Sequence, residues 1–190
     1  MGKKTTYVAS VRQSYLQLLF KLLGLPMLPN YIDGQFKIKT RLDDKNEIMF
    51  IGLTGFDNLK LNKEPDDKGD EYLLSYLPLL KQETFTVGAS YKHFALGHIQ
   101  QYSLSYSYLN NRGRKYLDND ESLPENLIMK SSGLEGKAQA RFENRSYYGA
   151  WTVREGAELA YRHYDTDIFR KLAGDNYLDY NSNIGFFGWG

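Results

Sequence analysis

The sequence predicts an all-β protein, an antiparallel transmembrane β-barrel segment of about eight meandering strands, and three observations lead to this class. First, apolar and polar residues alternate, as in Phe36, Ile38 and Thr40 against Lys37 and Lys39, which is the pattern of a strand with one apolar face. Second, short turns alternate with long loops, as in outer-membrane barrels. Third, the chain of 190 residues contains 16 Tyr and 10 Phe, which strands favour and membrane interfaces hold at headgroup depth.

The alternating segments predict the positions of the strands, and the residues between them predict that the two rims of the barrel differ in the length of their connections. We expect strands at residues 5–13, 34–43, 46–57, 83–94, 98–110, 132–144, 151–163 and 183–190. Turn-forming residues predict tight connections at 43–46, 95–98 and 146–150, which should share one rim. Long connections at 14–33, 58–82, 111–131 and 164–182 should share the other rim. The nearly apolar stretch Tyr15 to Leu28 is too short to span a bilayer, and we expect a short helix or an extended lip at the loop rim, with a membrane-surface helix as the alternative.

Composition excludes several classes of function. The 24 Lys and Arg are matched by 23 Asp and Glu, so a net charge of +1 gives no electrostatic footprint for a nucleic acid. The absence of Cys excludes disulfides and thiolate metal sites. A mean hydropathy of −0.55 looks soluble, yet barrels look soluble because every second residue faces water. The N-terminus lacks the apolar core of a signal peptide, and we expect residues 1–190 to form a single β-barrel domain or barrel fragment without a plug domain.

Ten charged residues fall on the polar side of the predicted strands. In a large membrane barrel such residues line the lumen, where they pair with one another or with a plug, so a scaffold role is favoured over direct ligand contact. The ten residues are Lys37, Lys39, Arg41, Glu135, Lys137, Arg141, Glu143, Arg154, Glu158 and Arg162.

Five residues of the predicted long loops have side chains that could contact an external ligand. Aromatic rings stack and guanidinium groups donate paired hydrogen bonds, although an aromatic girdle or loop packing also accounts for these residues. The five are Tyr72, Tyr76, Arg112, Arg114 and Tyr116.

No pattern in the sequence predicts catalysis or a resident cofactor. The histidines, His93, His98 and His163, are not arranged with carboxylates in a recognisable motif, and no serine sits in a nucleophile elbow. The acidic stretch 118–121 lacks the glycine and the distal glutamate of an EF-hand. We therefore expect no catalytic residue, no metal, no cofactor and no enzymatic activity.

Three sets of stretches are distinctive in their wording, namely Val11–Phe20 with Leu25 and Pro26, Gly34–Lys39 with Asp44–Glu47, and Arg141–Arg145 with Trp151–Gly156. In these stretches the chain resembles the barrel of a TonB-dependent outer-membrane receptor of Gram-negative bacteria. The resemblance implies a 22-stranded barrel in the cell outer membrane, closed by an N-terminal plug. It also implies import of an iron chelate, a vitamin or a glycan, with energy from the TonB complex. With eight predicted strands and no plug, the chain would be an internal segment of such a barrel, surrounded by outer-membrane lipid.

Two alternatives stay open at this stage. The first is a self-contained eight-stranded outer-membrane barrel with a structural role or a loop-mediated binding role, whose small interior is filled by side chains. The second is a soluble β-protein or barrel enzyme, which would need a buried polar cluster and a largely polar outer face. Pairing between the first and last strands separates the first alternative from a segment of a larger barrel.

Overall fold

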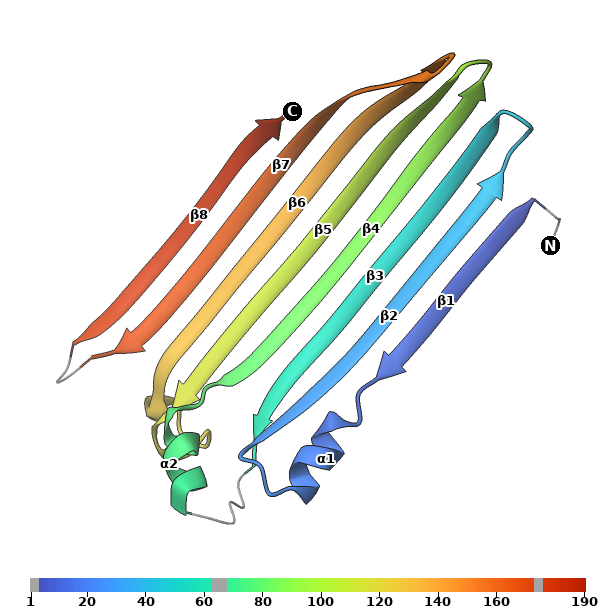
Figure 1. The fold of residues 1–190 in the computed structure, drawn as a ribbon. Coiled ribbons are helices and arrows are strands. Elements are labelled where there is room, and N and C mark those ends of the chain that lie inside the picture. The colour runs from blue at the N-terminus through green and yellow to red at the C-terminus, as the bar shows by residue number, and fades with distance from the viewer. Residues whose placement is uncertain (1–3, 63–67, 173–175) are drawn as a thin grey trace.

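The protein is all-β in the computed structural model, which describes residues 4–62, 68–172 and 176–190. Eight strands form one antiparallel sheet in which each strand pairs with its neighbours in the sequence (Figure 1). The strands are β1 (Thr5–Gln13), β2 (Met27–Arg41), β3 (Asn46–Leu61), β4 (Leu79–Ala95), β5 (His98–Tyr116), β6 (Leu127–Tyr148), β7 (Trp151–Lys171) and β8 (Tyr177–Trp189). The predicted all-β class, the antiparallel arrangement and the number of strands are confirmed, whereas closure into a membrane barrel stays a prediction. The sheet is open within the described residues, with β1 and β8 at opposite edges.

The short and long connections lie at opposite ends of the sheet, as the sequence predicted (Figure 1). Tight turns join β2 to β3, β4 to β5 and β6 to β7, and we call their end the turn rim. The turn after β4 uses Gly97, whose φ of 78° is a conformation that side chains with a Cβ disfavour. The other end, which carries α1 (Leu16–Leu22) and α2 (Lys68–Tyr76), is the loop rim.

Most strands extend farther towards the loop rim than predicted. The strand expected to begin at residue 132 begins at Leu127, and the strand expected to end at residue 163 ends at Lys171. The predicted long connections are correspondingly too long, because backbone pairing between neighbouring strands continues where the alternation of side chains changes its character. The hydrogen bonds between paired strands join backbone groups and therefore do not require a particular side-chain pattern.

The apolar stretch Tyr15 to Leu28 divides between a helix and a strand. It forms the short helix α1 at the loop rim, turns at Gly24 and continues into β2. No residue of α1 is buried, and Leu22 is 75% exposed. None of the helices in the described part of the chain has the length and apolar character needed to cross a bilayer.

The turn between β2 and β3 is fixed by one carboxylate. Asn46 Nδ2 donates to both oxygens of Asp43, at 2.8 and 2.7 Å, and the backbone amide of Lys45 donates to Asp43 Oδ1 at 2.7 Å. These bonds, chiefly those from the Asn46 side chain, hold the pKa of Asp43 below its ordinary value of 3.8. The turn is therefore stabilised by the ionised form of Asp43.

We expect this turn to loosen in acid. Because the pKa of Asp43 is lowered by folding, its stabilising contribution is complete above pH 3.8 and is lost as the pH falls through the lowered pKa. NMR titration of the Asp43 carboxyl carbon, with the protection of the Lys45 amide followed in parallel, measures this. Asp44→Asn should leave the Lys45 amide unchanged, whereas Asp43→Asn should weaken its protection at neutral pH. Equal effects of the two variants would contradict the assignment.

Cross-strand register carries one continuous apolar surface across the sheet. Directly paired residues project from the same face, and two neighbouring rows contain only apolar residues, Tyr and Gly. The rows are Ala9, Phe36, Gly52, Val87, Tyr106, Ala138, Tyr161 and Phe187, and Tyr7, Ile38, Phe50, Ala89, Leu104, Ala140, Leu159 and Trp189. We call this side of the sheet the apolar face. The ring of Phe36 covers Gly52 so closely that a Cβ on the glycine would lie 2.1 Å from Phe36 Cε1.

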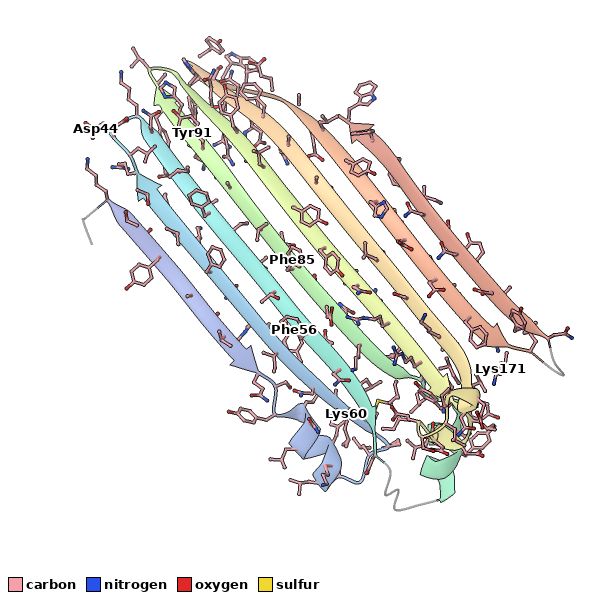
Figure 2. All side chains as sticks on the ribbon, turned by 180° about the vertical axis from the view of Figure 1, so that it is seen from behind. Asp44, Phe56, Lys60, Phe85, Tyr91 and Lys171 are labelled. Atoms are coloured by element: carbon pink, nitrogen blue, oxygen red, sulfur yellow. The ribbon has the colours of Figure 1, made fainter. Side chains whose placement is uncertain are left out.

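The apolar surface is a band of limited height. On β4 it runs from Phe85 to Tyr91, and Figure 2 places Phe85 in the middle of the sheet. Towards the loop rim the same face becomes polar, in the row Asn58, Lys81, Arg112, Ser132, Asp167 and Asn181. On the opposite face the trend is reversed, since charged residues near the turns give way to the row Pro29, Leu59, Leu80, Gly113, Ser131, Ile168 and Tyr180. The two faces therefore exchange their character along the strands.

The sheet is a single layer without a core of its own. Among the described residues the only buried hydrophobic side chains are those of Leu74 and Ala160. On the apolar face, Leu104 of the central strand β5 is 65% exposed and Phe187 of the edge strand β8 is 71% exposed. Stable soluble domains bury such a surface between two packed layers, so this face requires another apolar environment.

Candidate functional site

All ten charged residues that the sequence predicted to share a side lie on the face opposite the apolar band. Lys37 and Lys39 alternate with Phe36 and Ile38 along β2, and the cross-strand register extends the same assignment to β6 and β7. We call this side the charged face. The register thus places the ten residues on one face, and that this face lines a lumen stays a prediction.

The charged face carries cations and carboxylates in close pairs near the turn rim. Lys39 Nζ lies 2.9 Å from Glu47 Oε2, and Arg141 donates to Glu143 Oε1 at 2.7 Å. A hollow of about 670 Å³ in this region is lined by residues of β4 to β8, including Arg154, Glu158 and Arg162. Mixed charges of this kind hold water and polar partners, and they offer no surface to lipid chains.

Nearer the loop rim the charged face carries a row of hydrogen-bonding residues. The row is Tyr31, Asp57, Gln82, Asn111, Thr166 and Ser182, with Gly133 between Asn111 and Thr166. A second hollow of about 670 Å³ lies over its central part and is lined by Asp57, Gln82, Asn111 and Thr166 among others. Amide and hydroxyl groups in register can donate to and accept from a polar molecule along the row. The sequence analysis did not single out this row, because each member looks ordinary until the register aligns it with the others.

The five predicted ligand-contacting residues form two groups rather than one site. Tyr72 and Tyr76 lie on α2 with ring centroids 4.9 Å apart, and both are exposed. Arg112, Arg114 and Tyr116 lie at the end of β5, where Arg112 pairs with Glu83 at 2.5 Å. Arg112 and Arg114 project from the apolar-face side of the sheet, beyond the band. Ligand contact by any of the five stays a prediction.

Lys115 is a structural residue that the sequence analysis missed. Its ammonium donates to the backbone oxygens of Leu74 and Leu77, at 2.8 and 3.0 Å, and to Asn119 Oδ1 at 2.5 Å. Asn119 Nδ2 in turn donates to Leu74 O at 3.1 Å. Burial lowers the pKa of Lys115. The lysine joins the C-terminal end of α2 to β5 and so holds the loop that carries Tyr72 and Tyr76.

A second missed contact joins the first two strands. Arg12 donates from Nε and from a terminal nitrogen to Asp33 Oδ1, at 2.9 and 2.8 Å. Asp33 is only 7% exposed, so the guanidinium offsets much of the cost of burying its charge. The pair fixes the outermost strand β1 against β2 near the loop rim.

The potential metal ligands and general acids are dispersed. In the part of the chain that the structure describes, no group of three or more His, Asp or Glu residues could hold a metal ion. His93 Nδ1 lies 2.8 Å from Asn46 Oδ1 beside the turn rim, whereas His163 lies on β7 opposite Gly136. The histidines therefore do not converge in the described residues.

The chain was compared with known protein families and with curated proteins, and neither comparison identifies a relative. No model of a known protein family matches the chain, and a search of curated proteins finds no significant match.

Proposed function

We propose that this chain is part of the barrel of an outer-membrane receptor that takes up a nutrient with energy from the TonB system. The observation that carries the proposal is the single-layer sheet, with an exposed apolar band on one face and charged residues on the other. A barrel in a bilayer satisfies both faces at once, because lipid covers the band and water or a plug covers the charges. The resemblance of the strands around residues 11–39 and 141–156 to TonB-dependent receptors narrows the proposal to this family.

The height of the apolar band agrees with the thickness of a bilayer. On β6 the apolar-face residues from Phe142 to Leu134 are apolar or Gly, and Asn144 and Ser132 flank them. Nine residues at about 3.4 Å each span roughly 30 Å along the strand, and about 9–11 tilted residues cross the hydrocarbon core. The remainder of β6 would stand outside the membrane on the loop side, as expected of a receptor that meets its ligand outside the cell.

The open edges favour a segment of a larger barrel over a self-contained one. Membrane sheets must close, since an unpaired strand edge in lipid leaves several backbone groups without hydrogen bonds. In the described residues β1 and β8 pair only with β2 and β7. Further strands beyond β1 and β8 would satisfy these edges and give the charged face a wide interior. The substrate would be an iron chelate, a vitamin or a glycan, with a plug domain and the TonB complex as partners.

The test is to dilute the chain from urea into lipid vesicles, into detergent micelles and into plain buffer. Circular dichroism then measures its β-structure, and migration on a denaturing gel with and without heating shows whether a compact monomer forms. A segment should give β-structure with lipid vesicles only in assemblies in which the edges of β1 and β8 pair with other copies, and so no compact, heat-sensitive monomer band. A compact heat-sensitive band in detergent micelles would establish the self-contained eight-stranded barrel instead. A β-rich monomer in plain buffer would overturn the membrane proposal altogether.

A further inference from the structure

Five cations gather on the apolar-face side of the sheet, just beyond the band on the way to the loop rim. They come from four adjacent strands, β3 to β6, and Figure 2 shows Lys60 at this end of the sheet. The five are Lys60, Lys81, Arg112, Arg114 and Lys130. In the proposed orientation this is the outward side of the barrel, where the hydrocarbon core ends.

The register places these cations against one another. Lys81 lies directly opposite Arg112, and Arg114 lies directly opposite Lys130. Like charges that face each other across two strands are destabilising unless an anion compensates them. Two carboxylates compensate in part, because Glu83 pairs with Arg112 at 2.5 Å and Asp167 pairs with Lys130 at 2.9 Å.

Three of the five cations could interact with an added anion. Lys60, Lys81 and Arg114 form no ion pair within the residues that the structure describes. All three residues line one pocket of about 270 Å³, which Asn58, Tyr116 and the apolar residues Leu61, Leu77 and Leu79 also line. Glu121 and Lys115 also line the pocket, but the Lys115 ammonium is already bound by the oxygens of α2 and Asn119. Cations thus outnumber carboxylates in a space large enough for a small anion.

The donor set suits a phosphate group. Two ammonium groups supply mobile donors, and the guanidinium of Arg114 supplies a planar fork that matches two phosphate oxygens. Lys81 lies four residues beyond Phe85, the last apolar residue of the band on β4, which is about 14 Å along the strand. Strand tilt and the reach of a lysine side chain bring its ammonium close to the headgroup layer.

We propose that the pocket of Lys60, Lys81 and Arg114 binds a phosphate group, which we expect a phosphorylated lipid headgroup to supply. The lipid source rests on the proposed membrane function, because it requires the apolar band to face lipid. A free phosphate ion has the same chemistry, and the experiment separates the two sources.

The experiment is flotation of the chain with vesicles after dilution from urea. The vesicles are phosphatidylcholine alone, phosphatidylcholine with phosphatidic acid, and phosphatidylcholine with oleic acid at matched surface charge. The variant Lys60→Gln, Lys81→Gln, Arg114→Gln is compared with Lys37→Gln, Lys92→Gln, Lys137→Gln, which removes the same charge from the opposite face. Circular dichroism measures whether each variant keeps its β-structure. If a triple variant loses it, the three single substitutions are compared instead.

We expect the unsubstituted chain to bind vesicles that contain phosphatidic acid more tightly than vesicles of phosphatidylcholine alone. Removal of each pocket cation should lower the affinity for the phosphatidic acid vesicles roughly fivefold. The matched variant should lose much less, and oleic acid should not reproduce the effect of phosphatidic acid. Equal losses in the two triple variants, or equal strengthening by oleic acid, would overturn the site.

A second arm measures the line width of the phosphorus resonance of inorganic phosphate with the detergent-solubilised chain. Broadening that disappears in the pocket variant, without any preference for phosphatidic acid, would assign the site to free phosphate and reject the lipid source. Absence of both broadening and lipid preference would overturn the site itself. Failure to float with any vesicle would count against the membrane function, and the phosphorus arm would still decide whether the pocket binds phosphate.

Discussion

Leu104→Arg should destabilise the membrane-inserted sheet by about 2–4 kcal/mol, the cost of an arginine on the lipid face of a barrel near the bilayer midplane. Leu104 lies in the middle of the apolar band between Ala89 and Ala140, and it is 65% exposed. No carboxylate is its direct cross-strand partner. The fraction of chain that floats with phosphatidylcholine vesicles after dilution from urea measures the loss.

The matched control is the next residue on the same strand. Ser105 projects from the charged face between Gly88 and Gln139, so Ser105→Arg should cost no more than about 0.5 kcal/mol if that face is hydrated. A soluble β-protein would respond differently, because an exposed leucine in water can be replaced by arginine almost without cost. Equal flotation of the two variants would count against lipid contact, and a greater loss in Ser105→Arg would reverse the assignment of the faces.

The second large effect is expected at Lys115. Lys115→Met keeps most of the side-chain volume but removes the donor that serves Leu74 O, Leu77 O and Asn119 Oδ1. Hydrogen bonds from a charged donor contribute about 1.5–3 kcal/mol, so the packing of α2 on β5 should weaken by about that amount. Hydrogen exchange of the amides in residues 72–77 should quicken, and proteases should cut this segment sooner.

Lys37→Met is the control for this change, because Lys37 is exposed on the charged face far from α2. It should leave exchange in residues 72–77 unchanged, and both variants should keep the β-sheet signal in circular dichroism. If Lys115→Met also leaves exchange unchanged, the lysine does not hold α2.

The sequence allowed prediction of the turn half of the sheet because apolar and polar side chains alternate there residue by residue. Tyr102, Leu104 and Tyr106 could only share a face if the segment was extended, and the ten charged residues followed on the other side. The physical cause is the strict period of two that a half-buried strand imposes. Because the alternation has a period of two, it also predicts that the charged residues of each strand share a side, even when the register between strands is unknown.

The loop half could not be predicted in the same way. There the faces exchange character, so the alternation seen near the turns is interrupted, and the strand extensions at Leu127 and Lys171 carry little periodic signal. Residue 29 falls in the predicted long connection 14–33, yet Pro29 lies inside β2, beyond the last residue that pairs with β1, where the missing N–H is tolerated at an edge. Lys115 gave no signal because its partners in α2 lie about forty positions away in the sequence.

The order of the strands also determines how the sheet can assemble. In the described residues every strand pairs only with the strand before it and the strand after it in the chain, so each of these pairings closes a short loop at a modest entropic cost. Hairpins such as β4–β5 and β6–β7 can therefore form first and join side by side. Any pairing on the outer side of β1 or β8 would be non-local by comparison, and under the proposed function it would be the slow step of assembly.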